Sequence, residues 1–125
     1  MIEKGPTVAG EPQADCLFCK IVAGEIPATI VRETETTVAF RDINPQAPTH
    51  VLVIPRVHYP DAATLAASDP GATADVVREA GEVAALEKVD GTGYRIVFNT
   101  GRGAGQTVFH AHAHVLGGRD LQRLV

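Results

Sequence analysis

The stretch Gln106-Thr-Val-Phe-His110-Ala-His112-Ala-His114-Val-Leu-Gly-Gly118 carries three of the five histidines of this 125-residue chain. The histidines alternate with alanine, and residues two apart lie on the same face of an extended strand. We therefore predict a strand over residues 110–116 with three imidazoles on one side and small apolar residues, suited to packing against a helix, on the other. Because histidine exchanges its proton near neutral pH, this face is expected to be a chemical site.

Three hypotheses explain such a row of histidines. Histidines at positions i and i+2 of a strand can bind zinc. Alternatively, one imidazole attacks a phosphorus centre while its neighbours position it. In the third hypothesis each ring only satisfies a buried hydrogen bond, which is the common role of a lone histidine. Strict alternation rarely arises for packing alone, so we favour catalysis.

The segment before the histidines, Asn99-Thr-Gly-Arg-Gly-Ala-Gly105, is rich in glycine. Its glycines leave the main chain bare, so that N–H groups could approach an anion closely. Side-chain donors flank them at Asn99, Gln106 and Thr107. Alone, these glycines would more often serve a hairpin loop that needs positive φ. Beside three aligned histidines, a phosphate-binding loop becomes the favoured interpretation.

Composition and charge exclude several classes of protein. The chain is 45% hydrophobic with a net charge of −4, which predicts one soluble globular domain and no affinity for nucleic acid polymers. No apolar run approaches the roughly 20 residues of a membrane span. Residues 1–15 lack the apolar core of a secretory signal and are expected to be a flexible tail before a domain at 16–125. A cytoplasmic location is expected.

Hydrophobic periodicity predicts an α+β domain. A short helix is expected at Cys16–Ala23 with Asp15 as its N-cap, and one long helical region at Leu65–Val89, with a start signal at Asp69-Pro70. The apolar stripe of the long helix comprises Val76, Val77, Ala80, Val83 and Ala84. Strands are predicted at Thr29–Arg32, Thr36–Phe40, His50–Ile54, Tyr94–Phe98 and His110–Leu116. We expect an antiparallel sheet of about five strands rather than a Rossmann-type alternation.

The motif His110-Ala-His112-Ala-His114-Val-Leu resembles the signature of the histidine triad (HIT) superfamily. The resemblance extends to Cys16-Leu-Phe-Cys-Lys-Ile-Val, Ala39-Phe-Arg-Asp-Ile43, Pro45-Gln-Ala-Pro-Thr-His50, Val53-Ile-Pro55 and Gly105-Gln-Thr-Val-Phe-His110. Together these segments look like the histidine triad nucleotide-binding branch, which hydrolyses nucleoside phosphoramidates. The resemblance implies a HIT-like fold whose sheet continues across a homodimer, formed through the long helix and an edge strand.

The resemblance also assigns catalytic roles. His112 would attack the α-phosphorus, and water would then hydrolyse the nucleotidyl-histidine. His50 and His110 would hold that ring and its tautomer, while His114 would contact phosphate on the proton path to the departing amine. The implied donors to phosphate oxygens are Asn99 and Thr107, with the backbone around Gly105 and Gln106. Thr107 stands where close relatives often have serine. Such donors offset charge in the transition state, and no cofactor is implied.

Nucleoside recognition is implied for the N-terminal half. Asp42 would accept hydrogen bonds from both ribose hydroxyls, although alone it would be interpreted as a turn former. The implied slot for the purine comprises Leu17, Phe18, Ile21, Phe40, Ile43 and Leu52, which without the resemblance would be interpreted as ordinary core. Arg41 departs from the family pattern, and its guanidinium at the border of the base pocket could alter purine preference.

The only cysteines, Cys16 and Cys19, form a Cys-x-x-Cys pair. Without a secretion signal they are expected to be thiols or metal ligands rather than a disulfide. Some bacterial members of the superfamily bind structural zinc, and by that pattern the ligands would be Cys16, Cys19, His58 and His110. The alternative is that both thiols are small hydrophobes on a short helix. We favour the alternative, because the closer branch keeps similar cysteines without requiring metal.

Hydrolysis of a purine nucleoside 5′-phosphoramidate, of the AMP or GMP type, is the function that these expectations favour. A dinucleoside polyphosphate hydrolase or nucleotidyl transferase would use the same nucleophile with a different leaving group. A nucleotide-binding or interaction module with incidental catalysis would not need the proton-handling histidines. The intact set of histidines therefore favours an enzyme.

Overall fold

Five antiparallel strands form the sheet on which the histidines lie. A computed structural model describes residues 9–123, with β1 at Ile30–Glu33, β2 at Thr37–Arg41, β3 at Thr49–Pro55, β4 at Tyr94–Val97 and β5 at Ala113–Gly117. The strand order is β1-β2-β3-β5-β4. This arrangement confirms the predicted α+β class with an antiparallel sheet of five strands. It also makes β3 and β5 neighbours at the centre, which brings His50 close to His114.

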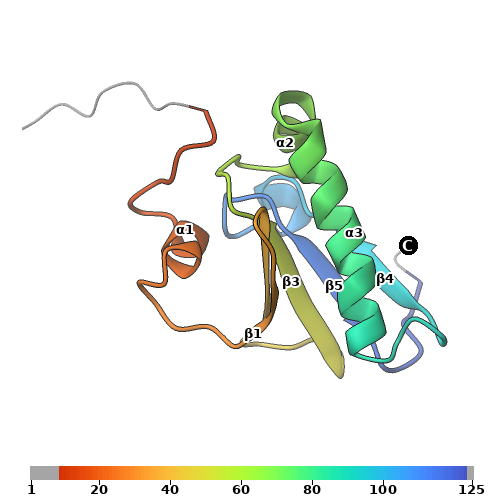
Figure 1. Ribbon diagram of the computed structural model, residues 1–125. Helices are drawn as coiled ribbons and strands as arrows, with labels where there is room; N and C mark the ends of the chain where they lie inside the picture. The colour runs from red at the N-terminus through yellow and green to blue at the C-terminus, as the bar shows by residue number, and fades with distance from the viewer. Residues whose placement is uncertain (1–8, 124–125) are drawn as a thin grey trace, which may run out of the picture.

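Helices cover both faces of the sheet. The long helix α3, Pro70–Leu86, lies across one face, and the short helix α1, Leu17–Val22, lies beside the opposite face (Figure 1). Figure 1 also shows α2, Ala62–Ser68, at one end of α3. A 3₁₀ turn, η1, spans Arg102–Ala104. Within residues 9–123, no helix is both long and apolar enough to cross a bilayer.

The predicted long helical region is in fact two helices, which corrects the expectation of one short and one long helix. Asp69 ends α2 and caps α3, since its Oδ1 accepts the N–H of Ala72 at 3.0 Å. Pro70 disfavours a helical conformation for the residue before it, so the break falls at the predicted start signal. The N-cap of α1 also differs from prediction, because Cys16 rather than Asp15 accepts the N–H of Cys19.

The central strand β3 is buried on both sides and separates two cores. The core beneath α3 comprises Ala39, Val51, Val53, Val76, Ala80, Val83, Ala113 and Val115. The core beneath α1 comprises Cys16, Phe18, Cys19, Val38, Phe40, Leu52 and Ile54. Alternate residues of one strand thus serve different layers, as the period of two requires. The side of the sheet that α1 covers is the side on which His114 lies, because His114 pairs directly with Leu52.

The histidine-rich segment enters the sheet later than predicted. β5 begins at Ala113, so His110 and His112 precede the strand. The N–H of Ala111 donates to the carbonyl of Tyr59 at 2.8 Å instead of joining the ladder. The predicted small apolar face is nevertheless present, because Ala113 packs in the core beneath α3 and Ala111 packs against α2 and α3 at Leu65 and Ala72.

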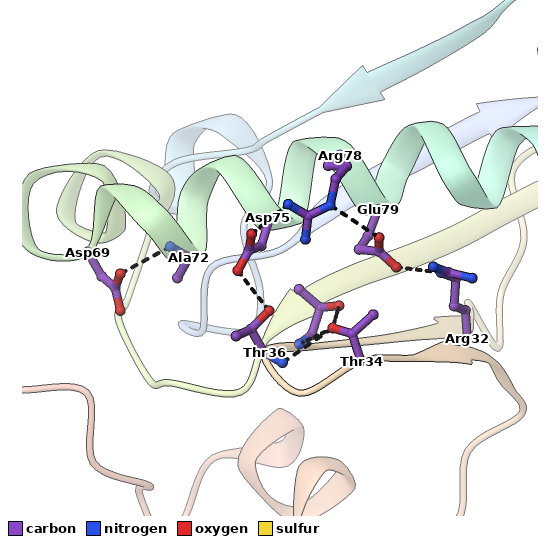
Figure 2. A network of polar contacts seen from close by, with 9 residues as sticks. Arg32, Thr34, Thr36, Asp69, Ala72, Asp75, Arg78 and Glu79 are labelled. Carbon is purple, nitrogen blue, oxygen red and sulfur yellow. Dashed lines mark hydrogen bonds and ion pairs between the residues drawn. The ribbon is translucent and has the colours of Figure 1, made fainter.

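Polar contacts fasten α3 to the hairpin formed by β1 and β2. The buried Glu79 carboxylate forms an ion pair with Arg32 of β1, and Asp75 accepts the Thr36 hydroxyl at 2.8 Å (Figure 2). These contacts fix the β1–β2 hairpin relative to the helix. One member of the predicted apolar stripe is not in the core: Val77 is 47% exposed, because it lies one position beyond the buried Val76.

Part of the expected N-terminal tail contacts the domain. Gly10 forms an isolated bridge with His58, whose N–H donates to the Gly10 carbonyl at 3.0 Å. Farther along, the N–H of Gln13 donates to the Cys19 thiol sulfur at 3.4 Å. Residues 1–8 of that tail lie outside the described residues. The segment before α1 is therefore held next to the histidines at residues 58 and 110.

Candidate active site

His50 and His114 form a hydrogen-bonded pair across β3 and β5. The Nε2 of His50 lies 2.9 Å from the Nδ1 of His114. The other nitrogen of His50 accepts the N–H of Gln46 at 3.0 Å, so it carries no proton in the neutral ring. His50 must then donate from Nε2, and His114 must accept at Nδ1 and carry its own proton on Nε2. The pair thus fixes the tautomer of His114 by backbone and side-chain contacts alone.

His112 is held in one tautomer by the main chain. Its Nδ1 lies 2.8 Å from the carbonyl oxygen of His110, which can only accept, so Nδ1 carries the proton. Nε2 therefore has a free lone pair. Burial lowers the pKa of His112 from its ordinary value, which keeps the ring neutral at physiological pH. A neutral, oriented imidazole with a lone pair at Nε2 is equipped to act as a nucleophile.

The side chain of His110 turns away from His112. Its Nε2 donates to the carbonyl of Pro55 at 2.8 Å, and its Nδ1 faces Cys16, Cys19 and His58. His50 likewise contacts His114 rather than His112. His110 contacts the nucleophile as expected, through its backbone carbonyl rather than its ring. The expected role of His50 in holding the nucleophile stays a prediction. Backbone groups carry no signature in sequence, so the contributions of Gln46 and Pro55 could not be predicted.

A cavity of about 320 Å³ opens between α1 and the sheet and ends at two of the histidines. The residues predicted for nucleoside recognition all line it: Leu17, Phe18, Ile21, Phe40, Asp42, Ile43 and Leu52, together with Thr107. Ile26, Pro27, Ala28 and Val108 complete the apolar wall, and no periodic signal marked them in the sequence. His112 and His114 form the polar end. The cavity is thus an apolar slot that leads to a row of imidazoles.

Comparison with known proteins agrees with this geometry. The HIT domain family matches residues 23–121. The chain belongs to the HIT domain family. A purine nucleoside phosphoramidase of Escherichia coli (strain K12) is 42% identical over 107 residues, which cover 86% of this chain and 90% of that protein. The resemblance inferred from the sequence motifs is confirmed.

Solved structures of HIT proteins share the fold. A HIT family hydrolase from Clostridium thermocellum has a TM-score of 0.86 and 42% identity, covering 90% of this chain and 98% of that one. A HIT family hydrolase from Legionella pneumophila has a TM-score of 0.83 and 47% identity, covering 86% and 96%. The five-stranded sheet with its helices is thus the HIT architecture.

Asp42 places a carboxylate beside the cavity. It directly follows β2, and its Oδ1 accepts the N–H of Asn44 at 2.8 Å, the local turn that its sequence context predicts. Its Oδ2 lies 3.4 Å from the Nε2 of His50. The carboxylate is therefore oriented by its own loop and lies against the His50–His114 pair. Its role toward ribose hydroxyls stays a prediction.

Arg41 is one of the residues that line the cavity, as expected, and its guanidinium is held by Glu87. Nη1 and Nη2 donate to the two carboxylate oxygens of Glu87 at 2.6 and 2.9 Å. Glu87 caps the end of α3, on the opposite side of the sheet from the cavity. An effect of Arg41 on purine preference stays a prediction.

The side chain of Gln106 stabilises the glycine-rich loop of the HIT domain through hydrogen bonds. The Gln106 Oε1 accepts the N–H of Gly101 at 2.8 Å, and its Nε2 donates to the carbonyls of Pro60 and Val108. The predicted use of this side chain as a free phosphate donor is therefore corrected. The N–H groups of Gly105 and Gln106 also donate within the loop, to Arg102 and Gly101. Positive φ at Gly101 and Gly105 supports the hairpin-loop interpretation of these glycines.

Two predicted phosphate donors remain beside the site. Thr107 lines the cavity, and no hydrogen bond among residues 9–123 uses its hydroxyl. Asn99 follows β4 two residues after Val97, the direct partner of His114. It is not part of the cavity wall. The contact of either side chain with phosphate stays a prediction.

Four side chains of types that ligate metals lie close together near the nucleophile. Ligand atoms of Cys16, Cys19, His58 and His110 all lie within 4.8 Å of one another. The sulfur–nitrogen distances are 3.5 Å for Cys16 with His110, 3.3 Å for Cys19 with His58 and 3.6 Å for Cys19 with His110. The two histidine Nδ1 atoms are 3.2 Å apart. Bond lengths of a tetrahedral zinc site place such ligands roughly 3.3 to 3.8 Å apart, so the four side chains fit zinc.

The other hydrogen bonds of these four side chains also favour a zinc site. The Pro55 carbonyl takes the Nε2 proton of His110 and so leaves a lone pair on Nδ1, as outer contacts of metal-bound histidine commonly do. The Gln13 N–H donates to the Cys19 sulfur. Without a metal, burial raises the pKa of the Cys19 thiol to about 11. The geometry therefore supports zinc ligation by these residues over the alternative, in which both thiols are small hydrophobes.

Proposed function

We propose that this HIT-family nucleotide hydrolase cleaves the P–N bond of purine nucleoside 5′-phosphoramidates through a covalent intermediate on His112. The observation that carries the proposal is the hydrogen bond from His112 Nδ1 to the His110 carbonyl, which leaves Nε2 free at the polar end of an apolar slot. The similarity to a purine nucleoside phosphoramidase supports the choice of substrate.

Substrate binding follows from the shape of the cavity. The purine enters between α1 and the sheet, against Phe18, Phe40 and Leu52. Asp42 accepts the ribose hydroxyls at the edge of the slot. The α-phosphate then lies beside His112 and His114, with the hydroxyl of Thr107 and the Nε2–H of His114 as donors to its oxygens. Both donors to the phosphate oxygens are neutral. Their hydrogen bonds strengthen as negative charge develops on those oxygens in the transition state.

The reaction proceeds in two displacements at phosphorus. The Nε2 lone pair of His112 forms a bond to phosphorus, and the P–N bond to the amine breaks. The departing nitrogen takes one proton from solvent along the path that His114 lines. Water then attacks phosphorus, the bond to His112 breaks, and the proton from water returns to solvent. The products are the nucleoside monophosphate and the free amine, with His112 restored.

The decisive test is to trap the intermediate. We expect rapid denaturation during turnover of adenosine 5′-phosphoramidate to leave an adenylyl group that peptide mass analysis locates on His112. His112→Ala should abolish turnover while the Kd for AMP changes by less than about tenfold, or roughly 1.4 kcal/mol. An adduct on another residue, or near-normal turnover by His112→Ala, would contradict the mechanism.

The alternative leaving groups are separated by substrate competition. A dinucleoside polyphosphate hydrolase or nucleotidyl transferase would form the same adduct from a diadenosine polyphosphate. We expect kcat/KM on one preparation to be higher for the phosphoramidate. A higher value for the polyphosphate would reassign the substrate while leaving the role of His112 intact. The homodimer and the cytoplasmic location remain predictions.

A further inference from the structure

The four metal-ligating side chains connect parts of the chain that are distant in sequence. Cys16 and Cys19 flank the start of α1, His58 follows β3, and His110 precedes β5. We propose that zinc held by these four residues sets the nucleotide pocket, by fixing α1 against the segment that carries the nucleophile. The proposal rests on the proposed function in one respect, because it takes the slot beneath α1 to be the nucleotide site.

The helix that forms one wall of the pocket is short. α1 has six residues, far fewer than the roughly 12 to 15 that a helix needs to be stable alone. It nevertheless supplies Leu17, Phe18 and Ile21 to the cavity. Its other support is the apolar core beneath it, which α1 joins through Phe18 and Cys19. The two cysteines at its start are therefore the positions where a metal would hold this wall most effectively.

Phe18 connects the cysteine pair to the nucleophile. It lies between Cys16 and Cys19 in sequence, so ligation of both sulfurs limits its movement. Its ring meets the ring of His112 edge to face with centroids 5.1 Å apart, and meets Phe40 in the same manner at 5.4 Å. Edge-to-face contacts depend on the position of both rings. A shift of α1 would thus alter the base slot and the environment of His112 together.

His110 connects the metal ligands to the nucleophile by a second route. Its ring offers Nδ1 to the cluster while its Nε2–H is held by Pro55. Its backbone carbonyl accepts the Nδ1–H of His112. A metal bond at His110 therefore fixes the peptide group that determines the tautomer of His112. The base slot is thus connected to the zinc ligands through Phe18, and the nucleophile is connected to them through the His110 carbonyl.

The test uses AMP binding and hydrogen exchange, neither of which requires turnover. We expect the purified protein to retain one zinc per chain by elemental mass analysis. Removing it with a chelator should weaken the calorimetric Kd for AMP at least tenfold and speed amide exchange in residues 16–22, and added zinc should restore both. Cys19→Ser should show the same weakening, and the chelator should have no further effect on it.

A matched control separates loss of the metal from general damage. Lys20→Ala changes α1 without removing a ligand and should keep both zinc and AMP affinity. Reversible chelation of the unaltered protein remains informative if Cys19→Ser fails to fold. Absence of zinc, or an AMP Kd within twofold after zinc removal, would overturn the proposal. Coupled zinc and AMP binding without phosphoramidate turnover would instead contradict only the proposed function.

Discussion

The Nε2 of His50 donates to the Nδ1 of His114 at 2.9 Å, although the two residues are not direct partners in the sheet. His50 pairs with Leu116, and His114 pairs with Leu52, so the two imidazoles are diagonal neighbours on adjacent strands. Their rings are 5.2 Å apart between centroids. We therefore predict that His50 is a positioning residue, which acts on substrate through the tautomer of His114.

Loss of the His50 donor should lower the rate more than the affinity. We expect His50→Ala to reduce kcat by about 10- to 100-fold, by analogy with the cost of removing a hydrogen-bond partner that orients a metal-bound histidine. The Kd for AMP should change less than threefold. His50→Gln, which keeps an amide donor, should recover part of kcat. Equal kcat for His50→Ala and the unaltered protein would refute the positioning role.

The pH dependence of kcat/KM should show that the histidines of the site become protonated only at acidic pH. Burial lowers the pKa of His114 to about 4, with the neighbouring His112 and His50 adding to the effect, and burial also lowers the pKa of His50. His114 therefore remains neutral well below pH 6.5, the pKa of His50 is also below its ordinary value, and we expect the neutral rings to be the active forms. We expect kcat/KM to stay level from pH 8 to about 6 and to fall only in more acidic buffers. Circular dichroism at each pH should verify folding; an acid limb centred at or above pH 6.5 would contradict this expectation.

Asp42 should discriminate ribonucleotides from 2′-deoxyribonucleotides. Asp42→Asn keeps an oxygen that can accept the Asn44 N–H, so the loop should remain intact. It loses the charge that strengthens hydrogen bonds from two hydroxyls. We expect the ratio of kcat/KM for ribose over 2′-deoxyribose phosphoramidates to fall about tenfold. Val38→Ala, in the core outside the cavity wall, is a control that should lower stability without changing that ratio.

The edge of the sheet at β4 should pair two chains. β4 is an outer strand of the sheet, and beside it Val77 and Tyr94 are 47% and 37% exposed. The Tyr94 hydroxyl lies against Gly81 of α3, so helix and strand form one surface. We expect sedimentation to give twice the 13.2 kDa chain mass. Val77→Glu should shift the protein toward monomer, whereas Ile30→Glu at the opposite edge should not; a monomer without substitution would exclude the dimer.

The sequence by itself determined the features that depend on local periodicity. Alternation placed Ala113 and Val115 on one face and His114 on the other, and Asp69-Pro70 marked the start of α3. The tertiary structure alone decided which groups orient each imidazole. His50 and His114 are 64 residues apart in sequence, and Cys19 and His110 are 91 apart. Such contacts arise from the packing of strands and loops, and several use backbone carbonyl or N–H groups, which every residue has and no sequence pattern distinguishes.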